Sequence, residues 1–282
     1  MLSAAKAAGA GQGATAVLAA LLEARTGQQI AQDRAWRLDT ALKPLLRERG
    51  MESLDQLVRE LLLGQDHQLG DRIVDALLNQ ESSFFRDAST FDLLGEALGE
   101  IAAGRRARIW SAGCSTGQEP LSLAMLLAER GADAFEILAT DVSEGALARA
   151  KAGRFTQFEI QRGLPIRRMM RWFDADGADW VAKPELMRYI SFRRINMVAD
   201  QQPPGRFDLV MCRNLLMYLA ADQRQAVLGR IAEALRPGGL LVLGAGETVI
   251  GQTRALAPSV RHRGLYEAAG DAAVGAAGRA AA

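Results

Sequence analysis

Hydrophobic residues recur at helical spacing in the first part of the chain. Over residues 28–79 the apolar positions stand three or four residues apart, most clearly in the segments 36–46 and 54–62. Side chains at this spacing share one face of a helix. Gly50 and Ser53 predict a helix end and a helix start between the two segments. We therefore expect a helical bundle here.

Short apolar runs alternate with helical segments over most of the remaining chain. The runs that suit buried strands are 108–112, 135–140, 189–195, 207–212 and 240–243. A turn is expected at 236–239, ahead of the last run. This alternation predicts an α/β fold with a doubly wound parallel sheet. Residues 154–188 are too long for a simple crossover and are expected to form an inserted subdomain.

The two ends of the chain show less periodicity in their hydrophobic positions. Residues 1–27 are rich in alanine and are expected to be a flexible segment. A secretory signal has weak support, because the basic region at its start would contain only Lys6. Residues 268–282 are rich in alanine and glycine and are expected to be a disordered tail. No apolar stretch reaches the roughly 18 residues of a membrane span. We therefore expect a cytoplasmic protein without membrane insertion.

The length, charge and composition of the chain disfavour several classes of function. The 282 residues have room for one full α/β domain and a smaller one, and the net charge of +1 gives no reason to expect nucleic acid as a partner. The two histidines and two cysteines stand in no metal-ligand spacing, so neither a metal site nor a Ser/His/Asp triad is expected. Cys114 and Cys212 each end a predicted strand and are expected to be small buried residues. A monomer is expected.

The first strand leads into a glycine-punctuated turn, and a helix opens near Pro120. Glycine lets the backbone approach a ligand closely, so Gly113 and Gly117 predict a nucleotide pocket at this crossover, with Gly113 at its floor. Asp141 ends the second strand, where a carboxylate can accept hydrogen bonds from a ribose diol.

The spacing of this turn selects among nucleotides. Gly113-x-x-x-Gly117 differs from the G-x-G-x-x-G of dinucleotide sites, and the turn carries no Lys or Arg for a phosphate. Glu119 would repel a pyrophosphate but suits a cationic centre, such as the sulfonium of S-adenosylmethionine. An ordinary βα turn of another α/β protein is the alternative at this point, and the spacing disfavours a nicotinamide oxidoreductase.

Ligands of such sheets bind beyond the carboxyl ends of the strands. The residues expected at this edge, besides Gly113, are Glu119, Asp141, Asn196, Met197, Arg213 and Asn214. Tyr218 stands four residues after Asn214 and would face the same side if a helical turn begins there. Ahead of the sheet, Arg86 follows two adjacent phenylalanines, and its planar guanidinium suits a carboxylate.

Five short motifs stand in order along the chain: ESSFFR (81–86), WSAGCSTGQEP (110–120), ATD (139–141), CRNLLMY (212–218) and PGG (237–239). In their order and approximate spacing they resemble the bacterial chemotaxis receptor methyltransferases of the CheR type. The resemblance covers roughly residues 28–267.

This resemblance implies an N-terminal helical domain over 28–79 and an S-adenosylmethionine-binding methyltransferase domain over 80–267, in which 154–188 is a small β-subdomain. It also implies methylation of glutamate side chains on the cytoplasmic helices of chemoreceptors, with S-adenosyl-L-homocysteine as product. The cofactor contacts that it implies are Gln80, Ser82, Arg86, Glu119, Asp141, Asn196, Met197, Arg213 and Asn214. Arg86 and Tyr218 are expected nearest the reaction centre.

Three positions depart from the family's usual pattern. Gln80 stands where Asn is common, Ser82 where Thr is common, and Leu121 where Tyr is common. Two alternatives keep the fold and the cofactor: a methyltransferase acting on another protein or a small molecule, and a non-catalytic S-adenosylmethionine-binding signalling module.

Overall fold

The computed structural model describes residues 2–30, 36–102, 106–131 and 134–269. The chain divides into two compact units. The helical unit comprises residues 1–79 and 218–220, and the sheet unit comprises residues 80–217 and 221–282. The expected tail at 268–282 lies outside the described residues, apart from its first two positions.

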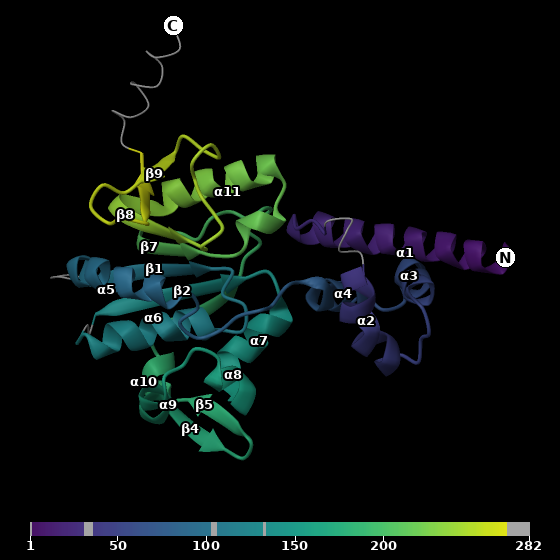
Figure 1. The fold of residues 1–282 in the computed structure, drawn as a ribbon, viewed down its shortest axis with the longest axis horizontal. Coiled ribbons are helices and arrows are strands. Elements are labelled where there is room, and N and C mark those ends of the chain that lie inside the picture. Colours follow the sequence, from purple (N-terminus) through teal and green to yellow (C-terminus); the bar gives the residue numbers. More distant parts are fainter. Residues whose placement is uncertain (1, 31–35, 103–105, 132–133, 270–282) are drawn as a thin grey trace, which may run out of the picture. The chain divides into compact units, whose positions relative to one another are not determined.

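The helical unit contains the helices α1 (Leu2–Thr26), α2 (Trp36–Glu48), α3 (Leu54–Leu63) and α4 (Leu69–Leu77) (Figure 1). Leucines from these helices, such as Leu18, Leu42 and Leu57, form a common buried core. The Ser53 side chain caps α3 by accepting the Gln56 N–H, as the sequence predicts for a helix start. Residues 218–220 belong to this unit because Leu219 pairs with Gln28.

The expectation of a flexible segment at residues 1–27 is wrong for the described part of that range. Residues 2–26 form α1, and its Ala14, Leu18 and Leu22 are at most 4% exposed. These three positions are four residues apart, so they lie on one face of the helix. The alanine-rich composition hides this face, because alanine occupies both buried and exposed positions and gives little hydrophobic contrast.

The sheet unit is built on a seven-stranded sheet in the order β6-β2-β1-β7-β8-β10-β9. Its strands are β1 (Ala107–Ala112), β2 (Phe135–Asp141), β6 (Ile190–Arg194), β7 (Phe207–Cys212), β8 (Leu235–Leu243), β9 (Leu256–Pro258) and β10 (Tyr266–Ala268). The strands β6, β2, β1, β7 and β8 pair in parallel, which confirms the predicted α/β fold. The antiparallel strands β9 and β10 close one edge. Their three residues each are too short to show a periodicity in the sequence.

Four long helices accompany this sheet: α5 (Ala88–Ala102), α6 (Gln118–Glu129), α7 (Glu144–Ala152) and α11 (Ala221–Ala234). Helices α5 and α6 share one core cluster with alternate residues of the strands, for example Ile109, Ile137 and Leu209. Helix α7 packs along β2 and β6, whereas α11 packs along β8, β9 and β10. Alternation of this kind brings the carboxyl ends of the parallel strands to one edge.

The expected turn at 236–239 is part of β8, which corrects the prediction of a strand beginning at 240. Between β7 and β8 the register shifts, so that Phe207 faces Leu235 and Leu209 faces Leu240. Residues 236–239 therefore form an irregularity within β8, at the register shift, and not a separate turn ahead of the strand. Gly239 is needed there, because a Cβ would lie 2.9 Å from the Phe207 carbonyl oxygen.

The insertion between α7 and β6 forms a small antiparallel sheet in the order β3-β5-β4. Its elements are β3 (Arg154–Thr156), α8 (Gln157–Gln161), α9 (Ile166–Trp172), β4 (Phe173–Asp176), β5 (Asp179–Ala182) and α10 (Pro184–Met187). The Phe84 ring contacts the rings of Phe155 and Phe173 at centroid distances of 5.0 and 5.6 Å. This aromatic cluster fixes the insertion to the segment that precedes α5.

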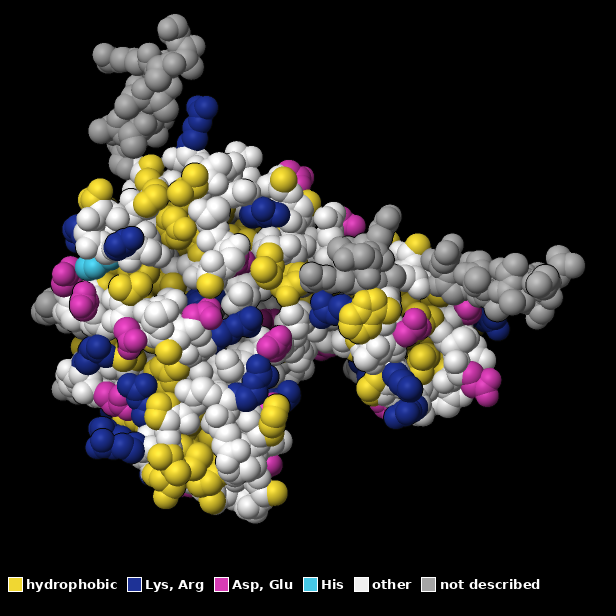
Figure 2. Space-filling view, viewed as in Figure 1, with side chains coloured by type: hydrophobic (Ala, Val, Ile, Leu, Met, Phe, Trp, Pro, Cys, Tyr) yellow, Lys and Arg dark blue, Asp and Glu magenta, His cyan; other side chains and the backbone are white. Residues whose placement is uncertain are grey.

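The surface of the sheet unit mixes charges of both signs, as Figure 2 shows for one face. Hydrophobic side chains gather over the insertion, where Phe158, Ile166 and Met170 are 71%, 70% and 62% exposed. Within the described ranges, no helix has the length and apolar character needed to span a membrane.

Candidate active site

The turn between β1 and α6 is fixed to the neighbouring strand. The backbone N–H groups of Gly113 and Cys114 both donate to the Thr140 carbonyl oxygen, at 2.8 and 2.9 Å. Gly113 and Gly117 have φ values of 82° and 96°, which favour glycine. At Gly117 a Cβ would also lie 3.0 Å from the Cβ of Ala150 in α7. The turn therefore brings bare backbone to the edge of the sheet, as the sequence predicts.

Asp141 ends β2 beside this turn. One carboxylate oxygen accepts the Ser115 N–H at 2.8 Å, and the other accepts the Ser143 N–H at 2.9 Å. The two backbone contacts hold the carboxylate in one orientation, which suits the recognition of a ribose diol.

The segment that precedes α5 lies against the same turn. The Ser115 hydroxyl donates to the Gln80 carbonyl oxygen at 2.9 Å, and the Gln80 amide donates to the Ser143 hydroxyl at 3.2 Å. Gln80 is thus brought together with Asp141 through two shared serines. Ser82, two residues further on, is half-buried.

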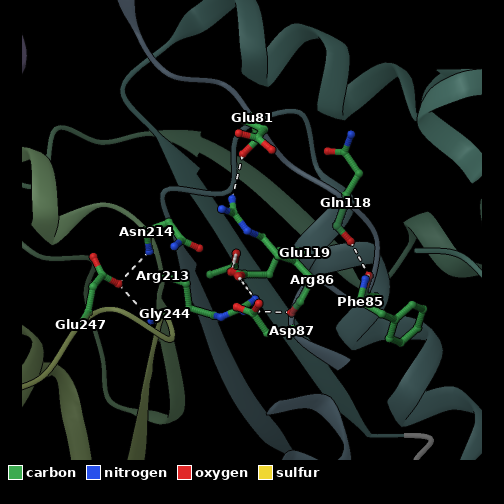
Figure 3. A network of polar contacts seen from close by, with 12 residues as sticks. Glu81, Phe85, Arg86, Asp87, Gln118, Glu119, Arg213, Asn214, Gly244 and Glu247 are labelled. Atoms are coloured by element: carbon green, nitrogen blue, oxygen red, sulfur yellow. Dashed lines mark hydrogen bonds and ion pairs between the residues drawn. The ribbon is translucent and has the colours of Figure 1, made fainter. Parts of the chain in front are cut away.

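Glu119, in the first turn of α6, lies in a network of polar groups (Figure 3), in which Ser111 and Arg213 are buried and the Glu119 side chain is 14% exposed. Its carboxylate accepts the Ser111 hydroxyl at 2.7 Å and pairs with the Arg213 guanidinium at 3.4 Å. Burial raises the pKa of Glu119, and the charge of Arg213 and the Ser111 hydrogen bond oppose that shift. A further positive charge near this carboxylate would favour its ionised form.

Arg213 is the most enclosed charged group of the network, with a side chain 3% exposed. Its guanidinium donates to the Arg86 carbonyl oxygen at 2.8 Å and to the Asp87 carboxylate at 2.6 Å. The guanidinium therefore ties the residues 86–87 to the end of β7 and to Glu119. The sequence predicted a cofactor contact at Arg213, and the structure adds this link within the protein.

The Arg86 side chain extends past Glu119 toward Glu81, whose carbonyl oxygen accepts one of its N–H groups at 3.3 Å (Figure 3). Its charge also lowers the pKa of Glu119 against the effect of burial. The structure thus brings Arg86, Glu119 and Arg213 together.

Three further predicted site residues follow the ends of β6 and β7. After β6, the Asn196 side chain accepts the Val198 N–H at 2.9 Å, and Met197 is half-buried beside it. After β7, Asn214 adopts a φ of 57°, and its N–H donates to the Glu247 carboxylate at 2.7 Å. Asn196, Met197 and Asn214 thus follow the carboxyl ends of β6 and β7, at the expected edge of the sheet.

Tyr218 ends a short 3₁₀ turn, η2 (Leu216–Tyr218), and belongs to the helical unit. Its hydroxyl accepts a hydrogen bond from the Asn79 side-chain amide at 2.6 Å. Tyr218 therefore follows the predicted cofactor loop in sequence, whereas its side chain contacts the end of the helical unit.

Backbone strain concentrates around these residues. In the described part of the chain, the non-glycine residues with positive φ are Phe85, Asp87, Ser115 and Asn214. Phe85 and Asp87 flank Arg86, the Ser115 N–H donates to Asp141, and Asn214 is itself a predicted site residue. Such conformations cost free energy and persist where the surrounding contacts impose them, which is typical of binding and catalytic sites.

Four residues of the site are not among those predicted from the sequence: Asp87, Ser111, Ser143 and Glu247. Asp87 directly follows Arg86, and Ser143 caps α7 two residues after Asp141, so both stand beside recognised motifs. Glu247 stands in the short sequence GAGE after β8. Nothing in that sequence alone indicates its partners.

Both cysteines are buried, as expected. Burial raises the pKa of each thiol, so both stay protonated at neutral pH and act as small apolar residues. Within the described residues, no group of His, Cys, Asp and Glu side chains could hold a metal ion.

The residues present fit S-adenosylmethionine. The turn at Gly113 and Gly117 presents backbone without side chains at these two positions, and a Cβ at Gly117 would collide with Ala150 of α7. Asp141 offers an oriented carboxylate to a ribose, and Glu119 offers a buried carboxylate whose ionised form a cationic ligand would stabilise. The turn itself offers no Lys or Arg to a phosphate.

The parallel sheet and this crossover define a class I S-adenosylmethionine-dependent methyltransferase fold. The family model described as "CheR methyltransferase, SAM binding domain" matches residues 80–263. Chemotaxis protein methyltransferase 1 of Pseudomonas aeruginosa is 36% identical over 240 residues, which cover 81% of this chain and 87% of the relative. Chemotaxis protein methyltransferase of Vibrio anguillarum is 36% identical over 241 residues, which cover 82% and 88%. The chain belongs to the CheR methyltransferase family.

Proposed function

We propose that this protein transfers the methyl group of S-adenosylmethionine to glutamate side chains on the cytoplasmic helices of chemoreceptors. The observation that carries the proposal is the site at the β1–α6 crossover, with Asp141 and Glu119 at its rim, in a chain whose relatives are named chemotaxis protein methyltransferases. The partner is then the cytoplasmic domain of a chemoreceptor, and the protein acts in the cytoplasm as a monomer.

In this proposal the cofactor contacts are Gln80, Ser82, Arg86, Gly113, Glu119, Asp141, Asn196, Met197, Arg213 and Asn214. When bound there, S-adenosylmethionine supplies an electrophilic methyl group on a positively charged sulfur. Asp141 is proposed to bind the ribose diol with the carboxylate that the Ser115 and Ser143 N–H groups orient. Glu119 faces the cationic part of the ligand, which offsets the cost of burying its charge.

The reaction places little demand on acid–base groups. A glutamate acceptor has a pKa of about 4.3 in water and is ionised at neutral pH, so no base is needed. One carboxylate oxygen forms the new O–CH₃ bond while the S–CH₃ bond breaks, and the bonding pair stays on sulfur. The protein's contribution is to hold the acceptor oxygen in line and to exclude water.

Arg86 and Tyr218 are the proposed catalytic residues. The Arg86 guanidinium presents N–H donors next to Glu119, where it can orient the incoming carboxylate. Asp87 and Arg213 hold the Arg86 backbone in place. The Tyr218 hydroxyl is proposed to hydrogen-bond or pack near the transferred methyl group.

The test is a methyl-transfer assay with methyl-labelled S-adenosylmethionine and receptor cytoplasmic fragments. We expect label on the receptor that alkali releases as volatile methanol, because carboxyl methyl esters are base-labile. Replacement of the receptor's acceptor glutamates by alanine should abolish this incorporation.

Two other outcomes would contradict the proposal. Label that survives alkali would indicate another acceptor group, and therefore a methyltransferase with a different substrate. Tight binding of S-adenosyl-L-homocysteine without any transfer to receptor fragments would indicate a non-catalytic signalling module.

A further inference from the structure

Glu247 follows the end of β8 and lies in the sheet unit, outside all the motifs recognised in the sequence. One of its carboxylate oxygens accepts two backbone N–H groups, from Asn214 at 2.7 Å and from Gly244 at 2.9 Å (Figure 3). The other oxygen accepts the Met217 N–H at 3.3 Å. A single carboxylate thus holds the loop after β7 at both ends.

The held loop is strained. Asn214 adopts a left-handed backbone with a φ of 57°. A non-glycine residue at positive φ is uncommon, and the contacts around it must impose the conformation. Hydrogen bonds from two N–H groups to one ionised oxygen are of the stronger, charge-assisted kind. Glu247 supplies these contacts at the point where the chain leaves β7.

Gly244 leaves the room that this arrangement needs. A Cβ at Gly244 would lie 2.9 Å from the Glu247 carboxylate oxygen, 2.9 Å from the Asn214 side-chain nitrogen and 3.0 Å from the Asn214 backbone nitrogen. The backbone N–H of Glu247 in turn donates to the Gly244 carbonyl oxygen at 2.9 Å. The turn from Gly244 to Glu247 is therefore held by two hydrogen bonds, one between the two backbones and one from the Gly244 N–H to the Glu247 carboxylate.

We propose that Glu247 is a positioning residue of the methyl-transfer site: it fixes the Asn214–Met217 loop, on which a proposed cofactor contact and the residue preceding Tyr218 both lie. The inference rests on the proposed function, since the loop matters for activity only if Asn214 and Tyr218 take part. Glu247 contacts neither cofactor nor acceptor and acts through the backbone of Asn214 and Met217.

The first test compares Glu247→Gln with Glu267→Gln. A glutamine can keep one acceptor oxygen, but its NH₂ group then faces a backbone N–H, so part of the contacts is lost along with the charge. Glu267 is a half-buried carboxylate of the same sheet that pairs with the Arg261 side chain instead of a loop backbone. We expect the Kd for S-adenosyl-L-homocysteine to rise about ten-fold and kcat to fall about ten-fold in Glu247→Gln. Glu267→Gln should leave both within two-fold of wild type, as expected for roughly neutral replacements away from the site.

The second test perturbs the same contacts without changing Glu247. Gly244→Ala inserts a Cβ against both partners, whereas Gly246→Ala places its Cβ 3.9 Å from the nearest side-chain atom, Met217 Cε. Gly244→Ala should raise the Kd and lower kcat in the same direction as Glu247→Gln. Gly246→Ala should resemble wild type. This pair decides the question even if Glu247→Gln does not fold.

The outcomes separate the two proposals. If wild type binds S-adenosyl-L-homocysteine and Gly244→Ala or folded Glu247→Gln binds and turns over as wild type does, Glu247 has no positioning role. A lowered melting temperature with unchanged Kd, KM and kcat would likewise overturn it, because that pattern reports a purely structural contact. If wild type binds neither S-adenosylmethionine nor its product, the proposed function itself fails and this inference fails with it.

Discussion

The Glu119 carboxylate shows how single residues set the chemistry of this site. It is placed among buried groups, where desolvation raises its pKa, and only Ser111 and two arginines oppose that shift. A buried carboxylate of this kind costs free energy unless a cation approaches it. The carboxylate already pairs with Arg213 at 3.4 Å, and its position in the first turn of α6 puts it beside the glycine turn.

Glu119 makes a testable link between pH and cofactor affinity. A cationic ligand prefers the ionised carboxylate, and the ionised fraction falls as pH drops through the pKa. Because the pKa of Glu119 is raised, affinity for S-adenosylmethionine should begin to fall at a pH above an ordinary glutamate value of about 4.3. Titration calorimetry across this range should show the fall in wild type and a flatter profile in Glu119→Gln. Equal pH slopes in the two proteins would rule out Glu119 as the group that faces the cation.

Tyr218 offers a second prediction at the scale of one residue. Tyr218→Phe keeps the ring and removes the hydroxyl that accepts the Asn79 hydrogen bond. Turnover should fall about ten-fold, while the Kd for S-adenosyl-L-homocysteine changes by less than about two-fold, because the hydroxyl is proposed to act in the transfer step. Tyr266→Phe is the control, since that hydroxyl donates to the Thr248 hydroxyl at 3.4 Å and Tyr266 is not among the proposed site residues. An unchanged kcat in Tyr218→Phe would remove Tyr218 from the mechanism.

At the scale of elements, the β1–α6 turn depends on a close approach of two helices. Gly117 combines a φ of 96° with a Cβ position 3.0 Å from Ala150 of α7. Gly131, after the end of α6, has a φ of 72° with open space around it. Both glycines therefore adopt a positive φ that favours glycine, but only at Gly117, of these two, would a Cβ meet a packed neighbour.

Alanine at these two glycines should separate the two effects. Gly131→Ala pays only the left-handed backbone cost of roughly 1–2 kcal/mol. Gly117→Ala should cost about 1–3 kcal/mol more, because the methyl group is forced against α7. Denaturant melts of the two variants measure the free energies of unfolding. Equal losses would mean that α7 moves aside without cost.

Helix α1 provides a prediction for the helical unit. Leu18 is fully buried, whereas its neighbour Val17 is 39% exposed. Leu18→Ala should lower the free energy of unfolding of this unit by about 2–5 kcal/mol, and Val17→Ala by about 0.5 kcal/mol or less. Hydrogen exchange resolved over α2, α3 and α4 can measure this loss within the full chain. Similar effects of the two substitutions would restore the interpretation of a flexible N-terminal segment.

These elements also show what sequence patterns can and cannot predict. The parallel strands and the helices of residues 28–79 follow from strong periodicity, which one sequence displays directly. Helix α1 was missed because alanine hides its buried face, and β9 and β10 because three residues carry no period. The register shift between β7 and β8 depends on a contact between Gly239 and Phe207, which are far apart in sequence.

At the scale of the whole molecule, the site is assembled from segments that lie far apart in the chain. Asp141 and the glycine turn were predictable because each ends a recognisable strand. Glu247 was not, since its partners Asn214 and Met217 are about thirty residues away and only the folded sheet brings them together. The link of Arg213 to Asp87 is of the same kind, because the two residues stand 126 positions apart in the sequence.

The net charge of the chain is +1, and charges of both signs are mixed on the face of the sheet unit that Figure 2 shows. In the proposed function, recognition of the cofactor depends on the local carboxylates, above all Asp141. Its two backbone hydrogen bonds fix the carboxylate before any ligand arrives, and preorganisation of this kind lowers the cost of binding.

Calorimetric titration with S-adenosyl-L-homocysteine tests this central claim most directly, in wild type, Asp141→Ala and Asp174→Ala. Asp174 is a control on the exposed side of the insertion, where its side chain is 71% exposed. We predict one-to-one binding to wild type and Asp174→Ala, and an affinity at least about ten-fold weaker for Asp141→Ala. Absence of heat with wild type, or equal binding by Asp141→Ala, would contradict the assignment of this crossover as the cofactor site.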